Sequence, residues 1–200
     1  MEIKKSHRTL VDDLCRQAHK LYNLRYQMSN GGNLSARIPG SDCMLVKGTD
    51  VDFSNVSFET LAVCDFNAVL LEGEVAPSKE ALLHGAIYRR FPQLASIMHC
   101  HSPWATAWAA KQDSLRFSTY HAAVKLKNHC PVFDTGSYVV PQQWIDVILD
   151  ELEAHPGMNS FLLRGHGQVT MGKTIQEAAS LAELVEETAQ IALLSALTKH

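Results

Sequence analysis

Segments with helical and strand-like patterns alternate along the whole chain, and this alternation constrains the fold more than any other feature of the sequence. Apolar residues recur with helical spacing over residues 4–28, 81–91, 103–111, 142–154 and 174–197. Short apolar stretches with turn residues at their ends indicate strands at residues 33–38, 44–46, 61–71, 94–101, 160–164 and 168–171. The alternation predicts an α/β or α+β domain whose central sheet is covered by helices.

The length and the charge of the chain restrict its possible roles. Without a repeat or a linker, residues 1–200 are expected to form a single domain. The formal net charge is -3 and the basic residues are not clustered, so we expect no nucleic-acid partner. No apolar run reaches the roughly 18 residues of a membrane span, so no membrane partner is expected. The charged start also lacks the apolar region of a signal peptide, which favours a cytoplasmic location.

Five cysteines are spread widely and form no CxxC pair, which argues against a zinc ribbon or a thioredoxin-like redox site. Cys100 is singled out because it lies between two histidines. If the segment is a strand, its side chain points away from theirs, so we interpret Cys100 as a packed thiol. A cysteine-nucleophile enzyme that uses Cys100 is a less favoured alternative.

Three histidines occupy positions suited to a metal. His99 and His101 are separated by one residue, so on a strand both imidazoles project to the same face. His166 lies between two glycines directly after another expected strand, where the chain can turn sharply and approach a ligand. Three neutral imidazoles plus an open position is a common catalytic zinc arrangement. The alternative is that these are sheet-end and turn histidines bonded to the backbone.

The segment Pro77-Ser78-Lys79-Glu80 is expected to open a helix, with Ser78 as the N-cap and Glu80 in the first turn. Free N–H groups at such a helix start bind anions, phosphate especially. A carboxylate beside a metal site can serve as a general base, although Glu80 could equally be an ordinary first-turn charge.

The motifs GGNLS, a Gly-Thr loop, PSKE, HCHS and RGHG occur in that order, and with them the chain resembles the class II aldolase/adducin family. The resemblance covers roughly residues 11–194. It implies an α/β three-layer fold with a central, mostly antiparallel sheet, and a C4 homotetramer whose active sites lie at subunit interfaces.

The resemblance also implies roles for individual residues. It makes His99, His101 and His166 the zinc ligands, although Mn²⁺, Co²⁺ or Ni²⁺ remain possible. Glu80 becomes the catalytic acid/base, and Tyr120 a proton donor that reaches a neighbouring subunit's site. The residues implied to hold the substrate phosphate are Asn33, Thr49, Ser78 and Lys79.

The function implied is a metal-dependent lyase that acts on a sugar or sugar phosphate through a metal-stabilised enediolate. Retro-aldol cleavage, as in the fuculose-1-phosphate aldolases, is favoured. The alternative is decarboxylation of a 3-oxo sugar acid or its phosphate, because segments around PSKE and LVEETAQIALL look closer to the family's decarboxylase branch. Asp50, which follows the Gly-Thr pair, would repel a phosphate unless Lys47 or Lys79 compensates. A remote alternative is a non-enzymatic, adducin-like interaction module.

Overall fold

The computed structural model describes residues 2–127 and 129–197. An eight-stranded sheet runs through it in the order β4-β3-β2-β1-β5-β8-β7-β6, and every neighbouring pair is antiparallel except β6 and β7. The strands are β1 (Asn33–Arg37), β2 (Cys43–Lys47), β3 (Leu61–Asp65), β4 (Leu70–Glu72), β5 (Ser96–Cys100), β6 (Val132–Phe133), β7 (Ser160–Leu163) and β8 (Gly167–Gly172). The helices are α1 (Glu2–Ser6), α2 (Arg8–Asn23), α3 (Ala81–Arg90), α4 (Pro103–Ala109), α5 (Tyr120–Lys125), α6 (Gln142–Ala154) and α7 (Ile175–Leu197), with a 3-10 turn at Phe53–Asn55.

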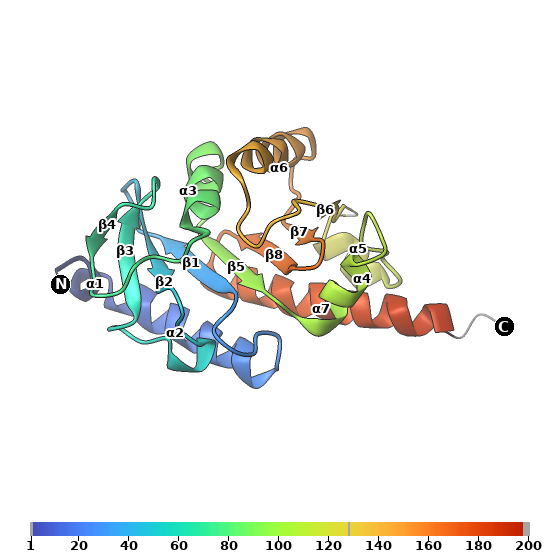
Figure 1. Cartoon of the computed structure of the whole chain (residues 1–200), viewed down its shortest axis with the longest axis horizontal. Helices are drawn as coiled ribbons and strands as arrows, with labels where there is room; N and C mark the ends of the chain where they lie inside the picture. Colours follow the sequence, from blue (N-terminus) through green and yellow to red (C-terminus); the bar gives the residue numbers. More distant parts are fainter. Residues whose placement is uncertain (1, 128, 198–200) are drawn as a thin grey trace.

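Helices cover both faces of this sheet, which confirms the expected three-layer α/β fold (Figure 1). On one face α3 and α6 pack over a core that includes Met44 and Val46 of β2. On the other face α2 and α7 pack over a second core that includes Leu45 from the same strand. Consecutive strand residues thus point to opposite layers, and both layers are apolar because neither face meets water. A third cluster joins α4 and α5 to the later half of α7.

The structure corrects several expected boundaries. The helix expected over residues 4–28 is two helices that meet at His7, and the second ends at Asn23. Arg25 then adopts a φ of 61°, a left-handed conformation that ends a helix, before the expected glycine-rich breaker is reached. Residues 61–71 form β3 and β4, separated by the expected turn, in which the Asp65 carboxylate accepts hydrogen bonds from the N–H groups of Asn67 and Val69. Helix α5 and strand β6 were not predicted, because both are too short to show a clear period.

The start of α3 also differs from the prediction. The helix begins at Ala81, so Glu80 is its N-cap residue and Ser78 lies in the preceding turn. The Glu80 side chain makes no capping bond, because it instead reaches Asn33. Among residues 2–127 and 129–197, no helix combines the length and the apolar composition that a membrane crossing requires.

Candidate functional site

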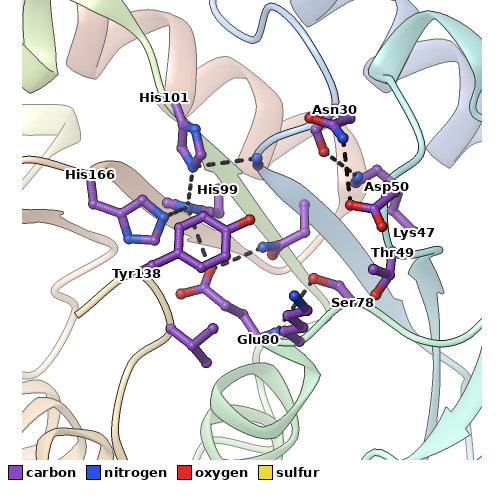
Figure 2. Close-up of a pocket in the computed structure, with 14 residues that line it drawn as sticks. Asn30, Lys47, Thr49, Asp50, Ser78, Glu80, His99, His101, Tyr138 and His166 are labelled. Atoms are coloured by element: carbon purple, nitrogen blue, oxygen red, sulfur yellow. Dashed lines mark hydrogen bonds and ion pairs between the residues drawn. The ribbon is translucent and has the colours of Figure 1, made fainter.

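Three central strands bring the three predicted histidines together. His99 lies in β5, His101 follows the end of that strand, and His166 lies in the turn between β7 and β8. Because β5 pairs with β8 on one side and with β1 on the other, this turn and the start of β1 flank His99 and His101. The three rings face one another (Figure 2), with centroids 4.6 to 4.9 Å apart.

The ring nitrogens have the spacing that a metal ion needs. His99 Nε2 lies 3.2 Å from His166 Nε2 and 3.1 Å from His101 Nε2. Nitrogen ligands at about 2.0–2.1 Å from a tetrahedral zinc ion are separated by roughly 3.3 Å. These three atoms could therefore share one ion without a rearrangement of the backbone.

The hydrogen-bond partners of these rings fit a metal as well. His99 Nδ1 donates to the carbonyl of Gln168 at 2.9 Å, which leaves the lone pair on Nε2. His101 Nε2 accepts from the N–H of Gly32 at 3.3 Å, so it too carries a lone pair. Two lone pairs that face each other repel unless a cation or a proton lies between them. Burial lowers the pKa of His99 to about 4, of His101 to about 3 and of His166 to about 4, so the rings are neutral at physiological pH, as metal ligands must be.

Two glycines allow His166 to reach this position. Gly165 has a φ of 65°, which L side chains rarely adopt. At Gly167 a Cβ atom would lie 2.3 Å from the carbonyl oxygen of Cys100, so only glycine lets β8 pass this close to the end of β5. The RGHG motif is thus explained by backbone conformation and close approach.

Glu80 lies beside the histidine cluster and is 5% exposed. Its Oε2 accepts a hydrogen bond from Asn33 Nδ2 at 3.0 Å and lies 3.4 Å from His99 Nε2. Burial raises the pKa of Glu80, while the hydrogen bond from Asn33 lowers it by a smaller amount. Glu80 Oε1, Asn33 Oδ1 and His166 Nδ1 are buried without a hydrogen-bond partner. A site with this many unpaired polar atoms is arranged to receive a polar ligand.

The other side of the same pocket carries three of the four residues expected to bind phosphate, while the fourth, Asn33, donates to Glu80 beside the histidines. Thr49, Ser78 and Lys79 line it, although the Thr49 hydroxyl already donates to the carbonyl of Pro77 at 2.8 Å. Lys47 and Asp50 line it too (Figure 2). Lys47 Nζ donates to the carbonyls of Asn30 and Val51, and burial lowers its pKa to about 8, although Asp50 and Asp52 act in the opposite direction. The pocket therefore has two lysines beside one aspartate.

The tyrosine that lines the pocket is not the one that the sequence analysis singled out. Tyr120 begins α5, is 94% exposed and is absent from the described pocket lining, so its role at a neighbouring subunit's site stays a prediction. Tyr138, which the sequence did not single out, lines the pocket with its ring centroid 5.7 Å from that of His166. The loop before α6 that carries Tyr138 has no charge or metal motif, so the sequence offered no signal for it. Cys100 is fully buried in the α2/α7 core, and burial raises the pKa of its thiol, which supports the packing interpretation.

Two buried polar side chains hold the His101 segment in place. Gln27 Oε1 accepts a hydrogen bond from the backbone N–H of His101 at 2.7 Å. Glu186 of α7 accepts from the N–H groups of Trp104 and Ala105, the first free donors of α4. Gln27 lies in the irregular segment after α2 and Glu186 on α7, and neither single polar residue gave a sequence signal, so only the tertiary contacts reveal these roles.

Comparison with known proteins supports the resemblance. The family model described as "Class II Aldolase and Adducin N-terminal domain" matches residues 12–193. The chain is 29% identical over 197 residues to a 3-oxo-tetronate 4-phosphate decarboxylase of Escherichia coli strain K12, covering 95% of this chain and 89% of that protein. It is 28% identical over 173 residues to an L-fuculose phosphate aldolase of Methanococcus maripaludis, covering 86% and 89%. The crystal structure of YgbL from Escherichia coli superposes with a TM-score of 0.82 at 29% identity, covering 93% of this chain and 89% of that one.

The family match covers nearly the whole described chain, and the superposition extends over the same sheet and helices. The mostly antiparallel sheet, the helical layers and the histidine cluster are the features that the sequence motifs led us to expect. This chain belongs to the class II aldolase and adducin N-terminal domain family.

Proposed function

We propose that this protein is a metal-dependent lyase that breaks a carbon–carbon bond beside the carbonyl group of a phosphorylated sugar derivative. The observation that carries the proposal is the meeting of three imidazole Nε2 atoms next to the buried carboxyl group of Glu80. A non-enzymatic module would have no need for a neutral histidine cluster with unpaired polar atoms around it.

In this proposal His99, His101 and His166 hold a divalent ion, with zinc favoured and Mn²⁺, Co²⁺ or Ni²⁺ as alternatives. When bound, the ion supplies positive charge that stabilises the negative charge left on the substrate oxygens as the bond breaks. Glu80 acts as the general acid for the substrate carbon at which the bond breaks. Burial raises its pKa and so favours the protonated form more than in an exposed glutamate, and the protonated form can donate a proton to the carbon that keeps the electron pair. Water then returns a proton to the carboxylate. Asn33 fixes the orientation of Glu80 through Oε2.

Decarboxylation of a 3-oxo sugar acid phosphate fits the pocket better than aldol cleavage. Lys47 and Lys79 both line the pocket, and such a substrate carries two anionic groups, a phosphate and a carboxylate. The Ser78 hydroxyl would add a neutral contact to the phosphate, and Thr49 would do so only after its hydroxyl leaves the carbonyl of Pro77. Relatives named 3-oxo-tetronate 4-phosphate decarboxylase are consistent with this choice: one from Haemophilus influenzae is 32% identical over 178 residues, covering 85% of this chain and 80% of that protein.

Retro-aldol cleavage of a ketose phosphate, which the sequence favoured, is the second candidate. Its specific support is Tyr120, because a tyrosine that is 94% exposed on a surface helix is available to a neighbouring subunit. A proton donor from that subunit would serve the oxygen of the leaving aldehyde. This candidate requires the homotetramer that the resemblance implied, with sites shared between subunits.

The deciding experiment supplies metal-replete protein separately with 3-oxo-tetronate 4-phosphate and with L-fuculose 1-phosphate. We expect carbon dioxide from the first and no aldehyde from the second. Glu80→Gln should lower the rate by roughly 10²–10⁴-fold, the usual contribution of general acid–base catalysis. Glu183→Gln, at a partly exposed carboxylate outside the lining of this pocket, serves as the matched control.

Aldehyde release from the ketose phosphate alone, weakened by Tyr120→Phe, would replace decarboxylation by the second candidate. No product from either substrate, with metal bound at the three-histidine site, would refute the proposed substrate class.

A further inference from the structure

A second group of potential metal ligands lies away from the pocket. It consists of His129, Glu151 and His155. Each histidine offers one ring nitrogen and the glutamate offers one carboxylate oxygen, and these three atoms lie within 4.8 Å of one another. His129 lies in the connection between α5 and β6, while Glu151 and His155 lie one turn apart at the end of α6. In Figure 1, α6 lies at the top of the molecule, and β6, the edge strand of the sheet, lies below it to the right together with α5. None of the three residues lines the pocket that holds Glu80.

The three side chains are already arranged around one oxygen atom. His129 Nε2 lies 2.7 Å and His155 Nδ1 lies 3.2 Å from Oε1 of Glu151. The two rings stack with centroids 3.9 Å apart and an interplanar angle of 22°. Two imidazoles and a carboxylate are thus in contact. Because the rings are nearly parallel, their in-plane lone pairs point side by side, and the more exposed ring of His155 has to turn about its side-chain bonds before both rings can bind one ion.

The backbone around this cluster is fixed. The N–H of His129 bonds to the carbonyl of Leu126, and the side chain of Asn159 donates to the carbonyl of Lys125 at 2.9 Å. On α6, the ring Nδ1 of His155 lies 3.1 Å from the carbonyl of Glu151. This bond leaves the lone pair of His155 on Nε2, so Nε2 is the atom that would bind an ion, while Nδ1 faces Glu151. Such a bond to a carbonyl is the usual way in which proteins orient a metal-binding histidine.

We propose that His129, Glu151 and His155 form a second metal site, which binds a divalent transition-metal ion and ties the α5–β6 connection to the end of α6. Two imidazoles and a carboxylate are a donor set that Zn²⁺, Ni²⁺ and Cu²⁺ accept, whereas Mg²⁺ and Ca²⁺ prefer oxygen ligands. The side chains are 30%, 31% and 45% exposed in residue order, so an ion can enter and keep water in its remaining positions. The ion would replace the ring proton that now lies between His129 and Glu151.

The test counts zinc bound per chain after metal-free protein is dialysed against a Zn²⁺ buffer, with metal content measured by atomic absorption. The double variant His129→Ala/His155→Ala should bind one zinc ion fewer per chain than the wild type. His121→Ala, which removes another exposed histidine outside the cluster, should bind as many as the wild type. Equal zinc content in the double variant and the wild type would overturn the proposal and leave His129 and Glu151 as an ordinary surface ion pair.

A second measurement separates this site from the histidine cluster near Glu80. In a His166→Ala background, Zn²⁺ should still raise the melting temperature, because the ion joins two segments that unfolding separates. Adding Glu151→Gln should abolish that rise. No rise in the His166→Ala background would overturn the second site, while a zinc count unaffected by His166→Ala would count against the three-histidine site instead.

Discussion

Replacement of Glu186 by glutamine tests whether a buried carboxylate on α7 holds the segment that follows His101. Glu186 is 2% exposed, and its two oxygens accept hydrogen bonds from the N–H groups of Trp104 at 2.9 Å and Ala105 at 2.8 Å. A glutamine keeps one acceptor oxygen but turns its NH₂ group toward the other N–H. That buried donor then lacks a partner, which costs about 1–3 kcal/mol. Loss of the negative charge at the start of α4 adds roughly 0.3–1 kcal/mol.

The expected loss of unfolding free energy is therefore about 1.3–4 kcal/mol. For a chain of 200 residues this lowers Tm by about 3–16 °C. The assay is thermal unfolding of metal-free protein followed by circular dichroism, because bound metal would add its own stabilisation.

The control is Glu183→Gln on the same helix, whose carboxylate lies 2.5 Å from Lys20 at the surface. Exposed pairs of this kind contribute about 0–1 kcal/mol, so its Tm should stay close to that of the wild type. Melting curves for Glu186→Gln that coincide with those for Glu183→Gln would refute the assigned role of Glu186.

Three further predictions follow from the site and its surroundings. His84 is buried, and burial lowers its pKa from 6.5 to about 3. As the pH drops below 6.5 the unfolded chain therefore binds a proton at this residue before the folded chain does, and the free energy of unfolding falls. In urea unfolding, His84→Asn should reduce the slope of this fall by up to about 1.4 kcal/mol per pH unit. Gly167→Ala places a Cβ atom 2.3 Å from the Cys100 carbonyl oxygen and should weaken zinc binding by roughly 10–100-fold in competition with a chelator; unchanged affinity would contradict the close approach. Because Lys47 loses its proton as the pH rises through about 8, KM for a phosphorylated substrate should increase above that pH, and Lys47→Met should remove this dependence.

Much of the architecture could be predicted because it depends on local patterns. Apolar periodicity located α6 and α7 and the strands β5, β7 and β8 to within about two residues, the usual ambiguity of element ends. The spacing of His99 and His101 indicated a shared face, and the glycines around His166 indicated a sharp turn. The ordered motifs then identified the family, which the comparisons confirmed.

The amino-acid sequence by itself therefore determined most of the helices and strands, the family and the three histidines that meet, but not α5, β6 or the break between α1 and α2. Only the tertiary structure decided which distant groups surround these histidines. Asn33 donates a hydrogen bond to Glu80, Gln27 and Glu186 accept hydrogen bonds from the segment after β5, and the ring of Tyr138 lies near that of His166. It also separated Tyr120 from the pocket of its own chain. The physical reason is that periodicity reports which face of a single element is buried, whereas a hydrogen bond across the sheet depends on strand order and register, which no local pattern encodes.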